Sequence, residues 1–181
     1  MRPVVVYQSK YGATERYARW ISEALSCPCR ERRNITPGEL SDYDTVLYGG
    51  GLYAGGVSGI RLLTANWETL RTKRILLFTC GLSDPADPDN AAHILDGLSK
   101  VLTSEMQEQI EFFHLRGGID YRTLGPLHRA MMGMLYRTLK KKDPRTLRTE
   151  DLELLRTYGK RVDFTDRSAI LPILSALQRE K

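Results

Sequence analysis

Short apolar runs alternate with segments of helical periodicity along the first two thirds of the chain. Four runs are rich in β-branched and aromatic residues, which favour buried strands: Val4–Val6, Thr45–Tyr48, Ile75–Thr79 and Ile110–Leu115. A fifth run, Cys29–Ile35, is more polar and suits a strand at a sheet edge. Between the runs, apolar residues recur every three or four positions, as on one face of a helix. This alternation predicts an α/β fold, a doubly wound five-stranded parallel sheet with helices on both faces.

The last third of the chain has a different pattern. Residues 124–142 form a strongly basic helical segment, and a closing helix is predicted over 165–179, where Pro172 should kink the helix or delay its start. The basic helix has an apolar side and a charged side. The apolar side carries Leu127, Met131, Met134, Leu135 and Leu139, and the other side carries Arg129, Arg137, Lys140 and Lys141. We expect one domain over 1–181, with a basic helical C-terminal extension at about 120–160.

Charge and cysteine content narrow the class of protein. The net charge of +5 and the pI near 9.2 favour acidic partners, an anionic membrane surface or a carboxylate-bearing substrate. Three cysteines, including Cys27 and Cys29, cannot form a disulfide framework. The chain enters its first strand directly after Met1-Arg2-Pro3, without a signal-peptide layout, and it has no long apolar run. We therefore expect a cytoplasmic protein.

The segment between the first strand and the first helix has the composition of a phosphate-binding loop. Free backbone N–H groups and the helix dipole both favour an anion at a helix N-terminus. Ser9 and Thr14 add hydroxyl groups there, and Gly12 allows close approach of the backbone. The loop lacks the glycine spacing and the Gly-Lys-Ser/Thr ending of a nucleotide-binding P-loop. The alternative is an ordinary strand–turn–helix connection with a threonine cap.

Two further loops should meet the first one at the carboxyl edge of the sheet, where open α/β sheets bind ligands. They are Gly49–Gly56 and Thr79–Pro85, both rich in small residues. Gly49-x-Gly51-x-x-Ala54 also fits the spacing of a dinucleotide-binding loop. That site requires a carboxylate at the end of the next strand, and here the next carboxylate is only Asp84. We therefore consider dinucleotide binding the less favoured interpretation of this segment.

The spacing of Ser9, Gly12 and Thr14 directly after the first strand resembles the FMN-phosphate loop of the flavodoxin family. Tyr11 stands where that family commonly has a second threonine. The resemblance covers about residues 3–116 and implies FMN as cofactor. Tyr53 is the candidate to stack on the flavin ring, because aromatic faces suit an extended π-system, and the alternative is an ordinary surface or core tyrosine. The implied cofactor-binding residues are Ser9, Lys10, Tyr11, Gly12, Ala13, Thr14, Gly51, Leu52, Tyr53, Ala54, Gly55, Thr79, Cys80 and Gly81.

Three later segments resemble a narrower group, the menaquinone-dependent protoporphyrinogen oxidases. The segments are His114-Leu115-Arg116, the basic Met-rich stretch 129–134, and 162–166 with its Thr-Asp helix start. This resemblance implies an FMN enzyme that oxidises protoporphyrinogen and passes electrons to quinone at a membrane. The chain departs from the group by lacking a long insertion around residues 80–110.

Two classes of function follow from this reading. The favoured one is an FMN-dependent oxidoreductase that passes electrons from a reduced substrate to quinone. The alternative is a flavodoxin-type carrier between protein partners, since no substrate acid or base is recognisable. The basic helix either docks on an anionic membrane, at the inner face, or packs on the sheet with its charges solvated. His93, His114 and His128 are dispersed, so we expect no metal site, although His114 ends a strand near the ligand edge. No aromatic-basic module for nucleic acid is present.

Overall fold

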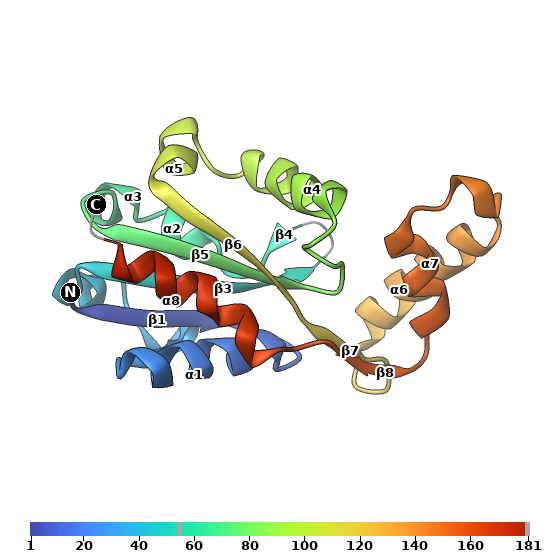
Figure 1. Cartoon of the computed structure of the whole chain (residues 1–181), viewed down its shortest axis with the longest axis horizontal. Coiled ribbons are helices and arrows are strands. Elements are labelled where there is room, and N and C mark those ends of the chain that lie inside the picture. Colours follow the sequence, from blue (N-terminus) through green and yellow to red (C-terminus); the bar gives the residue numbers. More distant parts are fainter. Residues whose placement is uncertain (54–55, 180–181) are drawn as a thin grey trace.

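A five-stranded parallel sheet forms the centre of the molecule (Figure 1). The computed structural model describes residues 1–53 and 56–179. The strand order is β2-β1-β3-β5-β6, as expected for a doubly wound sheet with the polar strand at its edge. A short strand, β4, adds to the end of β3 in antiparallel pairing. The strands are β1 (Pro3–Gln8), β2 (Cys29–Glu31), β3 (Thr45–Tyr53), β4 (Gly56–Val57), β5 (Arg74–Gly81) and β6 (Ile110–Arg116).

Helices cover both faces of the sheet, and the three central strands, β1, β3 and β5, are buried on both sides. One face carries α1 (Ala13–Leu25) and α8 (Leu171–Gln178), which pack on the core around Val5, Leu47 and Leu76. The other face carries four helices over a core that includes Val6, Val46 and Leu77. These helices are α2 (Arg61–Thr64), α3 (Trp67–Leu70), α4 (Pro88–Ser99) and α5 (Ser104–Gln109).

Local signals explain where these helices begin and end. Between β5 and β6 the chain forms two helices, α4 and α5, since Thr103 accepts a hydrogen bond from the N–H of Met106 and caps α5. Pro172 delays the closing helix, because it lies in the first turn of α8, where a missing N–H costs nothing. Single 3-10 turns fill the remaining connections: Arg32–Asn34, Gly38–Asp42, Pro144–Thr146 and Arg167–Ile170.

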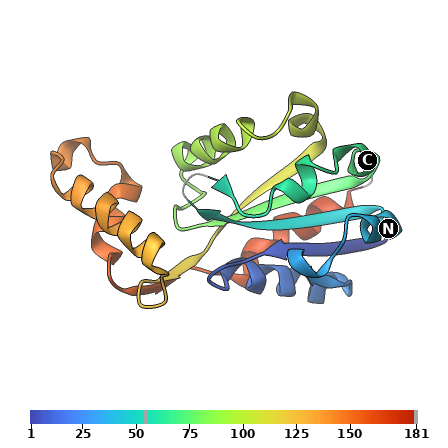
Figure 2. The same ribbon diagram turned by 180° about the vertical axis from the view of Figure 1, so that it is seen from behind.

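Residues 118–163 form a small lobe that projects from the carboxyl edge of the sheet, and we call it the cap lobe (Figure 2). Its base is an antiparallel ribbon of β7 (Gly118–Asp120) and β8 (Arg161–Asp163). Above the ribbon lie α6 (Pro126–Lys140) and α7 (Thr149–Thr157). The basic segment is thus inserted between β6 and α8, and the chain returns to the sheet after it.

The cap lobe has its own small core, built on Ile119, Tyr121 and Leu124. Helix α6 packs against α7 and not on the sheet, which excludes the alternative in which the basic helix packs on the sheet (Figure 1). Only Leu139 of α6 is buried, whereas Leu127 and Met134 are each 70% exposed. Within residues 1–53 and 56–179, no helix combines the length and hydrophobicity needed to cross a bilayer.

Candidate functional site

The first loop turns sharply from β1 into α1. Gly12 has a positive φ of 90°, a conformation that side chains strongly disfavour, and its N–H donates to Ser9 Oγ at 3.0 Å. Helix α1 starts at Ala13 without a side-chain cap, so its first N–H groups are not used inside the helix. A Cβ added at Gly12 would meet no atom within 4 Å, so the surface beside the loop is open. The loop therefore has the free donors and the open surface that an anion requires.

The second predicted loop is part of the sheet. Gly49, Gly50 and Gly51 lie in β3 and pair with β5, so the prediction of a loop there is wrong. The glycines are needed for packing, because a Cβ at Gly49 would lie 2.2 Å from the Phe78 ring and one at Gly50 would lie 2.3 Å from Val57. A dinucleotide loop joins a strand to a helix, so this position inside a strand argues against that reading.

The ends of β3 and β5 contribute side chains to a pocket under the cap lobe. Of the predicted cofactor residues, Tyr11, Ala13, Thr14, Leu52, Tyr53, Cys80 and Gly81 line this pocket. Its other walls come from the loop after β5, from the ribbon and from α6. These walls are Leu82, Gly117, Gly118, Ile119, Leu124, His128, Met131 and Met132. Most of the lining is apolar or aromatic, which suits a flat ring system.

Tyr53 lies at the centre of an aromatic group beside the first loop. Its hydroxyl accepts a hydrogen bond from the N–H of Lys10 at 3.2 Å, and its ring meets the edge of the Tyr11 ring at 5.8 Å. Burial raises the pKa of the Tyr53 phenol. The His128 ring stacks on Tyr53 with centroids 5.6 Å apart and an interplanar angle of 30°. His128 thus covers a face of Tyr53 that a planar ligand could use.

His128 is a site residue that sequence reasoning missed. Its Nδ1 lies 2.7 Å from the Tyr11 hydroxyl, and its Nε2 lies 3.5 Å from Lys10 Nζ, across 118 residues of sequence. Helical periodicity placed His128 on a basic helix, and nothing in that pattern indicated which side of α6 would face the first loop. The folding of the cap lobe over the sheet edge brings these residues together.

Thr79 and His114 lie away from the pocket. Thr79 is fully buried, and its Oγ1 lies 2.8 Å from His114 Nδ1 on the neighbouring strand. Neither side chain lines the pocket, although Thr79 was predicted to bind the cofactor and His114 ends a strand near the ligand edge, because strand alternation turns them toward the α4 face. Burial lowers the pKa of His114. Thr79 and His114 are therefore structural partners inside the sheet.

Cys80 faces the opposite side of β5 from Thr79 and does line the pocket. Burial raises the pKa of its thiol to about 12, so the thiol is protonated and unreactive near neutral pH. Gly81 must be small, since a Cβ there would lie 2.8 Å from the Leu52 side chain. Two predicted residues, Ala54 and Gly55, lie outside the described residues.

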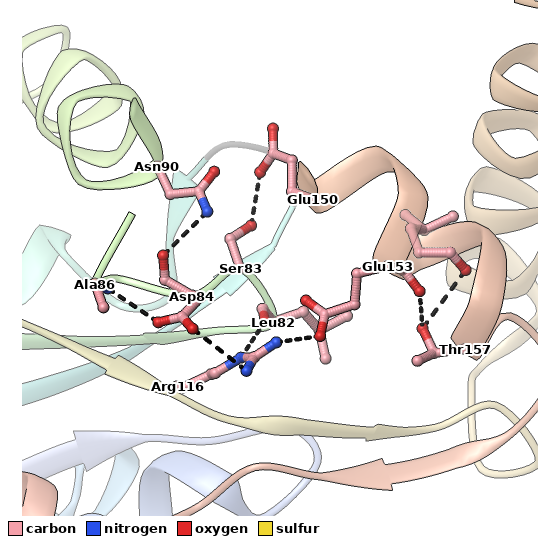
Figure 3. A network of polar contacts seen from close by, with 10 residues as sticks. Leu82, Ser83, Asp84, Ala86, Asn90, Arg116, Glu150, Glu153 and Thr157 are labelled. Atoms are coloured by element: carbon pink, nitrogen blue, oxygen red, sulfur yellow. Dashed lines mark hydrogen bonds and ion pairs between the residues drawn. The ribbon is translucent and has the colours of Figure 1, made fainter. Parts of the chain in front are cut away.

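A polar network fastens the cap lobe to the loop after β5 (Figure 3). Arg116, at the end of β6, forms an ion pair with Glu153 of α7 and lies 3.6 Å from Asp84, while its Nε donates to the Leu82 carbonyl at 3.2 Å. Ser83 Oγ donates to the Glu150 carboxylate at 2.9 Å. The network therefore holds α7 next to the loop that forms one wall of the pocket.

The arrangement fits a flavin mononucleotide better than a metal. The described part of the chain contains no group of three histidine, cysteine, aspartate or glutamate residues that could hold a metal ion. The open first loop provides donors for a phosphate, and the adjoining pocket provides aromatic and apolar contacts for a ring. Ser9, Lys10 and Gly12 lie in the first loop, and Gly51 leaves room for the Tyr53 ring, since a Cβ at Gly51 would lie 2.7 Å from it.

Comparison with solved structures finds similar folds at low identity. Flavodoxin 2 from Bacillus cereus is 16% identical, with a TM-score of 0.48, over 88% of this chain and 95% of its own. A WrbA-like flavodoxin from Agrobacterium tumefaciens is 18% identical, with a TM-score of 0.43, over 98% of both chains. No curated protein matches the sequence.

The family comparison is more informative, because it covers most of the chain. The model of the Flavodoxin domain family matches residues 4–146, from the first strand through α6 of the cap lobe. The match therefore includes the first loop, both strand ends of the pocket and the His128 helix. This chain belongs to the Flavodoxin domain family.

Proposed function

We propose that the protein binds FMN non-covalently, with the phosphate at residues 9–14 and the ring in the pocket beneath the cap lobe. Family membership supports a flavin-binding redox protein. The first loop has free N–H groups next to an open surface, and Tyr11 and Tyr53 offer aromatic faces to a ring. FMN would supply the electron transfer itself, while the protein binds and orients the reactants and controls access of water.

We further propose that the protein is an oxidoreductase that takes electrons from a reduced substrate and delivers them to quinone. One observation carries this proposal: the cap lobe covers the pocket with apolar side chains from α6 and the loop before it. Leu124, Met131 and Met132 form this wall. A carrier between proteins works best with an accessible flavin edge, whereas a covered apolar pocket is suited to a small ring compound. The narrower resemblance supports protoporphyrinogen as the electron donor.

The exposed apolar side of α6 suits an anionic membrane surface, where quinones reside. Leu127 and Met134 are each 70% exposed on this side, and Met131, which also lines the pocket, is 41% exposed between them. Beside this row lies a groove lined by Arg129, Arg137 and Lys141. Exposed apolar side chains next to basic ones are the pattern by which helices lie in the interface of an anionic bilayer. We propose that α6 brings the mouth of the pocket to the membrane.

FMN binding is tested by changing the one glycine that the first loop needs. Gly12→Ala forces a side chain into a left-handed backbone conformation, which costs about 1–2 kcal/mol, and should reduce the FMN content of the purified protein at least tenfold. Gly38→Ala is the matched control, because Gly38 also has open space beside it but no positive φ. Acid-released flavin and the visible spectrum measure the result. Stoichiometric FMN in Gly12→Ala would place the phosphate elsewhere.

Membrane and quinone function are tested together with liposomes. The wild type should co-sediment with phosphatidylserine vesicles at low salt, less so at high salt, and reduce menadione faster on them. Reversing three α6 charges should abolish sedimentation and leave the bound FMN in place. The variant carries Arg137→Glu, Lys140→Glu and Lys141→Glu.

The control reverses three charges far from α6 and should still sediment. It carries Arg30→Glu, Arg33→Glu and Arg61→Glu. Wild-type protein that stays in the supernatant at low salt would refute the membrane proposal. Protein that holds FMN and exchanges electrons with a protein partner, but not with menadione, would favour the carrier function. Protoporphyrinogen, assayed as donor by the fluorescence of its oxidised product, tests the substrate.

A further inference from the structure

The side chain of His128 has contacts that an ordinary solvent-facing helix residue does not make. It leaves α6 toward the first loop, stacks on Tyr53, and places its two ring nitrogens beside Tyr11 Oη and Lys10 Nζ. It also lines the pocket, next to Leu124 and Met132 of the cap lobe. A planar ring that stacks on the face of Tyr53 covered by His128 must therefore displace the His128 imidazole, and a ring elsewhere in the pocket has His128 in its wall.

Two of the other ionisable groups that line the pocket, Cys80 and Tyr53, are poorly suited to proton transfer near neutral pH. Burial raises the pKa of the Cys80 thiol to about 12 and also raises that of the Tyr53 phenol, so both hold their protons. No carboxylate lines the pocket within the described ranges. Imidazole is the side chain whose ordinary protonation range is closest to physiological pH, and it serves as both acid and base in enzymes.

We propose that His128 is the acid–base residue of this pocket and protonates the quinone during its reduction. The proposal rests on the proposed function and deepens it, because it supplies the acid that the reaction needs. Reduction of a quinone to a quinol requires two electrons and two protons. Bound FMN, once reduced, would supply a hydride, which would account for both electrons and one proton. The second proton must come from the protein or from water.

In this step the quinone accepts the hydride at one carbonyl oxygen, which leaves a negative charge on the other oxygen. The His128 imidazolium breaks an N–H bond and gives its proton to that oxygen, so an O–H bond forms and the neutral imidazole remains. Starting from the anionic form of the reduced flavin, the products would be oxidised flavin, quinol and neutral His128, so that both charge and atoms would balance. A proton from solvent restores the imidazolium for the next cycle.

The surroundings of His128 connect it with solvent on one side and with the pocket on the other. Lys10 is exposed and lies 3.5 Å from Nε2, so this nitrogen is near the outside of the protein. Nδ1 lies 2.7 Å from the hydroxyl of Tyr11, which lines the pocket. The ionisable groups that face His128 are Lys10 and Tyr11 of the first loop and Tyr53 of β3, while Arg129 is its neighbour on α6.

The first test replaces His128 by glutamine, which keeps hydrogen-bonding capacity but cannot transfer a proton in this pH range. We expect His128→Gln to hold FMN and to lose menadione reductase kcat by about 100-fold, the usual contribution of a general acid. The part of the pH dependence of kcat that comes from the His128 imidazole in the wild type should be absent in His128→Gln. His93→Gln is the control, because His93 is exposed on α4 and should leave both rate and pH profile unchanged.

Tyr11→Phe separates the imidazole from its phenol contact. It removes the hydroxyl beside Nδ1 and leaves the imidazole in place, so it should shift the pH profile but not eliminate its dependence on pH. An unchanged rate and pH profile in His128→Gln would overturn the proposal. Loss of FMN from His128→Gln would overturn it as well, because His128 would then hold the cofactor.

A second test does not depend on turnover. The oxidised protein cannot reduce menadione, so menadione can be added to it as a ligand. NMR of ring-labelled histidine should show shifts of the His128 resonances on addition, while those of His93 and His114 stay in place. If menadione binds and the His128 resonances do not shift, His128 does not contact the quinone and the proposal is refuted. If the wild-type protein lacks FMN or does not reduce menadione, the proposed function itself is refuted. If the wild type binds FMN and reduces menadione, and His128→Gln does so at the same rate, only this inference is refuted.

Discussion

Neighbouring positions on one strand have opposite roles at the ligand edge of the sheet. Thr79 is fully buried toward α4, where it meets His114, and Cys80 faces the pocket on the other side. Because successive side chains of a strand point to opposite faces of the sheet, Thr79 lies in the core while its neighbour Cys80 lines the pocket. Cys80 carries an unreactive thiol, and its contribution to the pocket is therefore shape and not chemistry.

His114 should make the stability of the protein depend on pH. Burial lowers the pKa of His114 in the folded state, so the unfolded chain binds more protons between that value and the ordinary value of about 6.5. The free energy of unfolding should then fall as pH decreases below about 6.5. His114→Gln should weaken this dependence, and thermal unfolding midpoints between pH 7.5 and pH 5.5 measure it.

His93→Gln serves as the control for this pH experiment. His93 is exposed, so its removal should leave the pH dependence of the unfolding midpoint as in the wild type. If His114→Gln and His93→Gln lose stability equally on acidification, burial of His114 is not the source of the effect.

At the scale of elements, Arg116 connects β6, the loop after β5 and helix α7. Its guanidinium pairs with Glu153 and lies 3.6 Å from Asp84 (Figure 3). It also lies over the Phe164 ring, 3.8 Å from the ring centroid. The Arg116 side chain is only 22% exposed, so its ion pairs are less screened than those on the open surface. This residue therefore contributes to the position of the cap lobe over the pocket.

We expect Arg116→Met to loosen the cap lobe without unfolding the sheet. The change leaves Glu153 and Asp84 without their common partner and should cost about 1–2 kcal/mol, since these carboxylates keep partial access to water. Hydrogen exchange should accelerate in α7, while amides of β1, β3 and β5 stay protected.

The matched control for this change is Arg122→Met. Arg122 is also an ion-paired arginine of the cap lobe, but it is 74% exposed and contacts a residue only two positions away. We expect little change in exchange for this variant. Unchanged protection of α7 in Arg116→Met would show that the apolar contacts of the lobe suffice to hold it.

At the scale of the whole molecule, the sheet and the cap lobe have separate cores. The two clusters on the faces of the sheet contain no buried residue of the lobe, whose own cluster is Ile119, Tyr121 and Leu124. The lobe leaves and returns through one ribbon, in which Gly118 pairs with Asp163 (Figure 2). Stability of the sheet and coverage of the pocket are therefore largely independent properties.

Excision of the cap lobe should leave a folded protein with weaker FMN binding and no membrane attachment. Residues 119–162 would be replaced by a short Gly-Ser linker, because the paired ends of the ribbon are adjacent. The sheet should keep its cooperative unfolding transition, and calorimetry and FMN titration measure the two effects. Failure of the excised protein to fold would show that the lobe supports the sheet edge.

The sequence by itself determined the framework of this protein. Strand runs and helical periodicity were sufficient for the parallel sheet and its edge strand, because burial on both faces leaves continuous apolar runs. The tight turn of the first loop could also be predicted from the sequence, since small and hydroxyl-bearing residues favour the local backbone geometry of such a turn. Gly12, with its positive φ, belongs to this local class. Pro172 likewise indicated the delayed start of α8.

Only the tertiary structure decided how the pocket is closed. Periodicity gave the apolar side of α6 but not its partner, and α6 packs on α7 instead of the sheet. The glycine run at Gly49–Gly51 resembled a loop, yet it lies in a strand where the Phe78 ring and Val57 occupy the space of a side chain. His128 reaches Tyr11 and Lys10 across more than a hundred residues. Contacts of this kind depend on packing between distant segments, which no local pattern encodes.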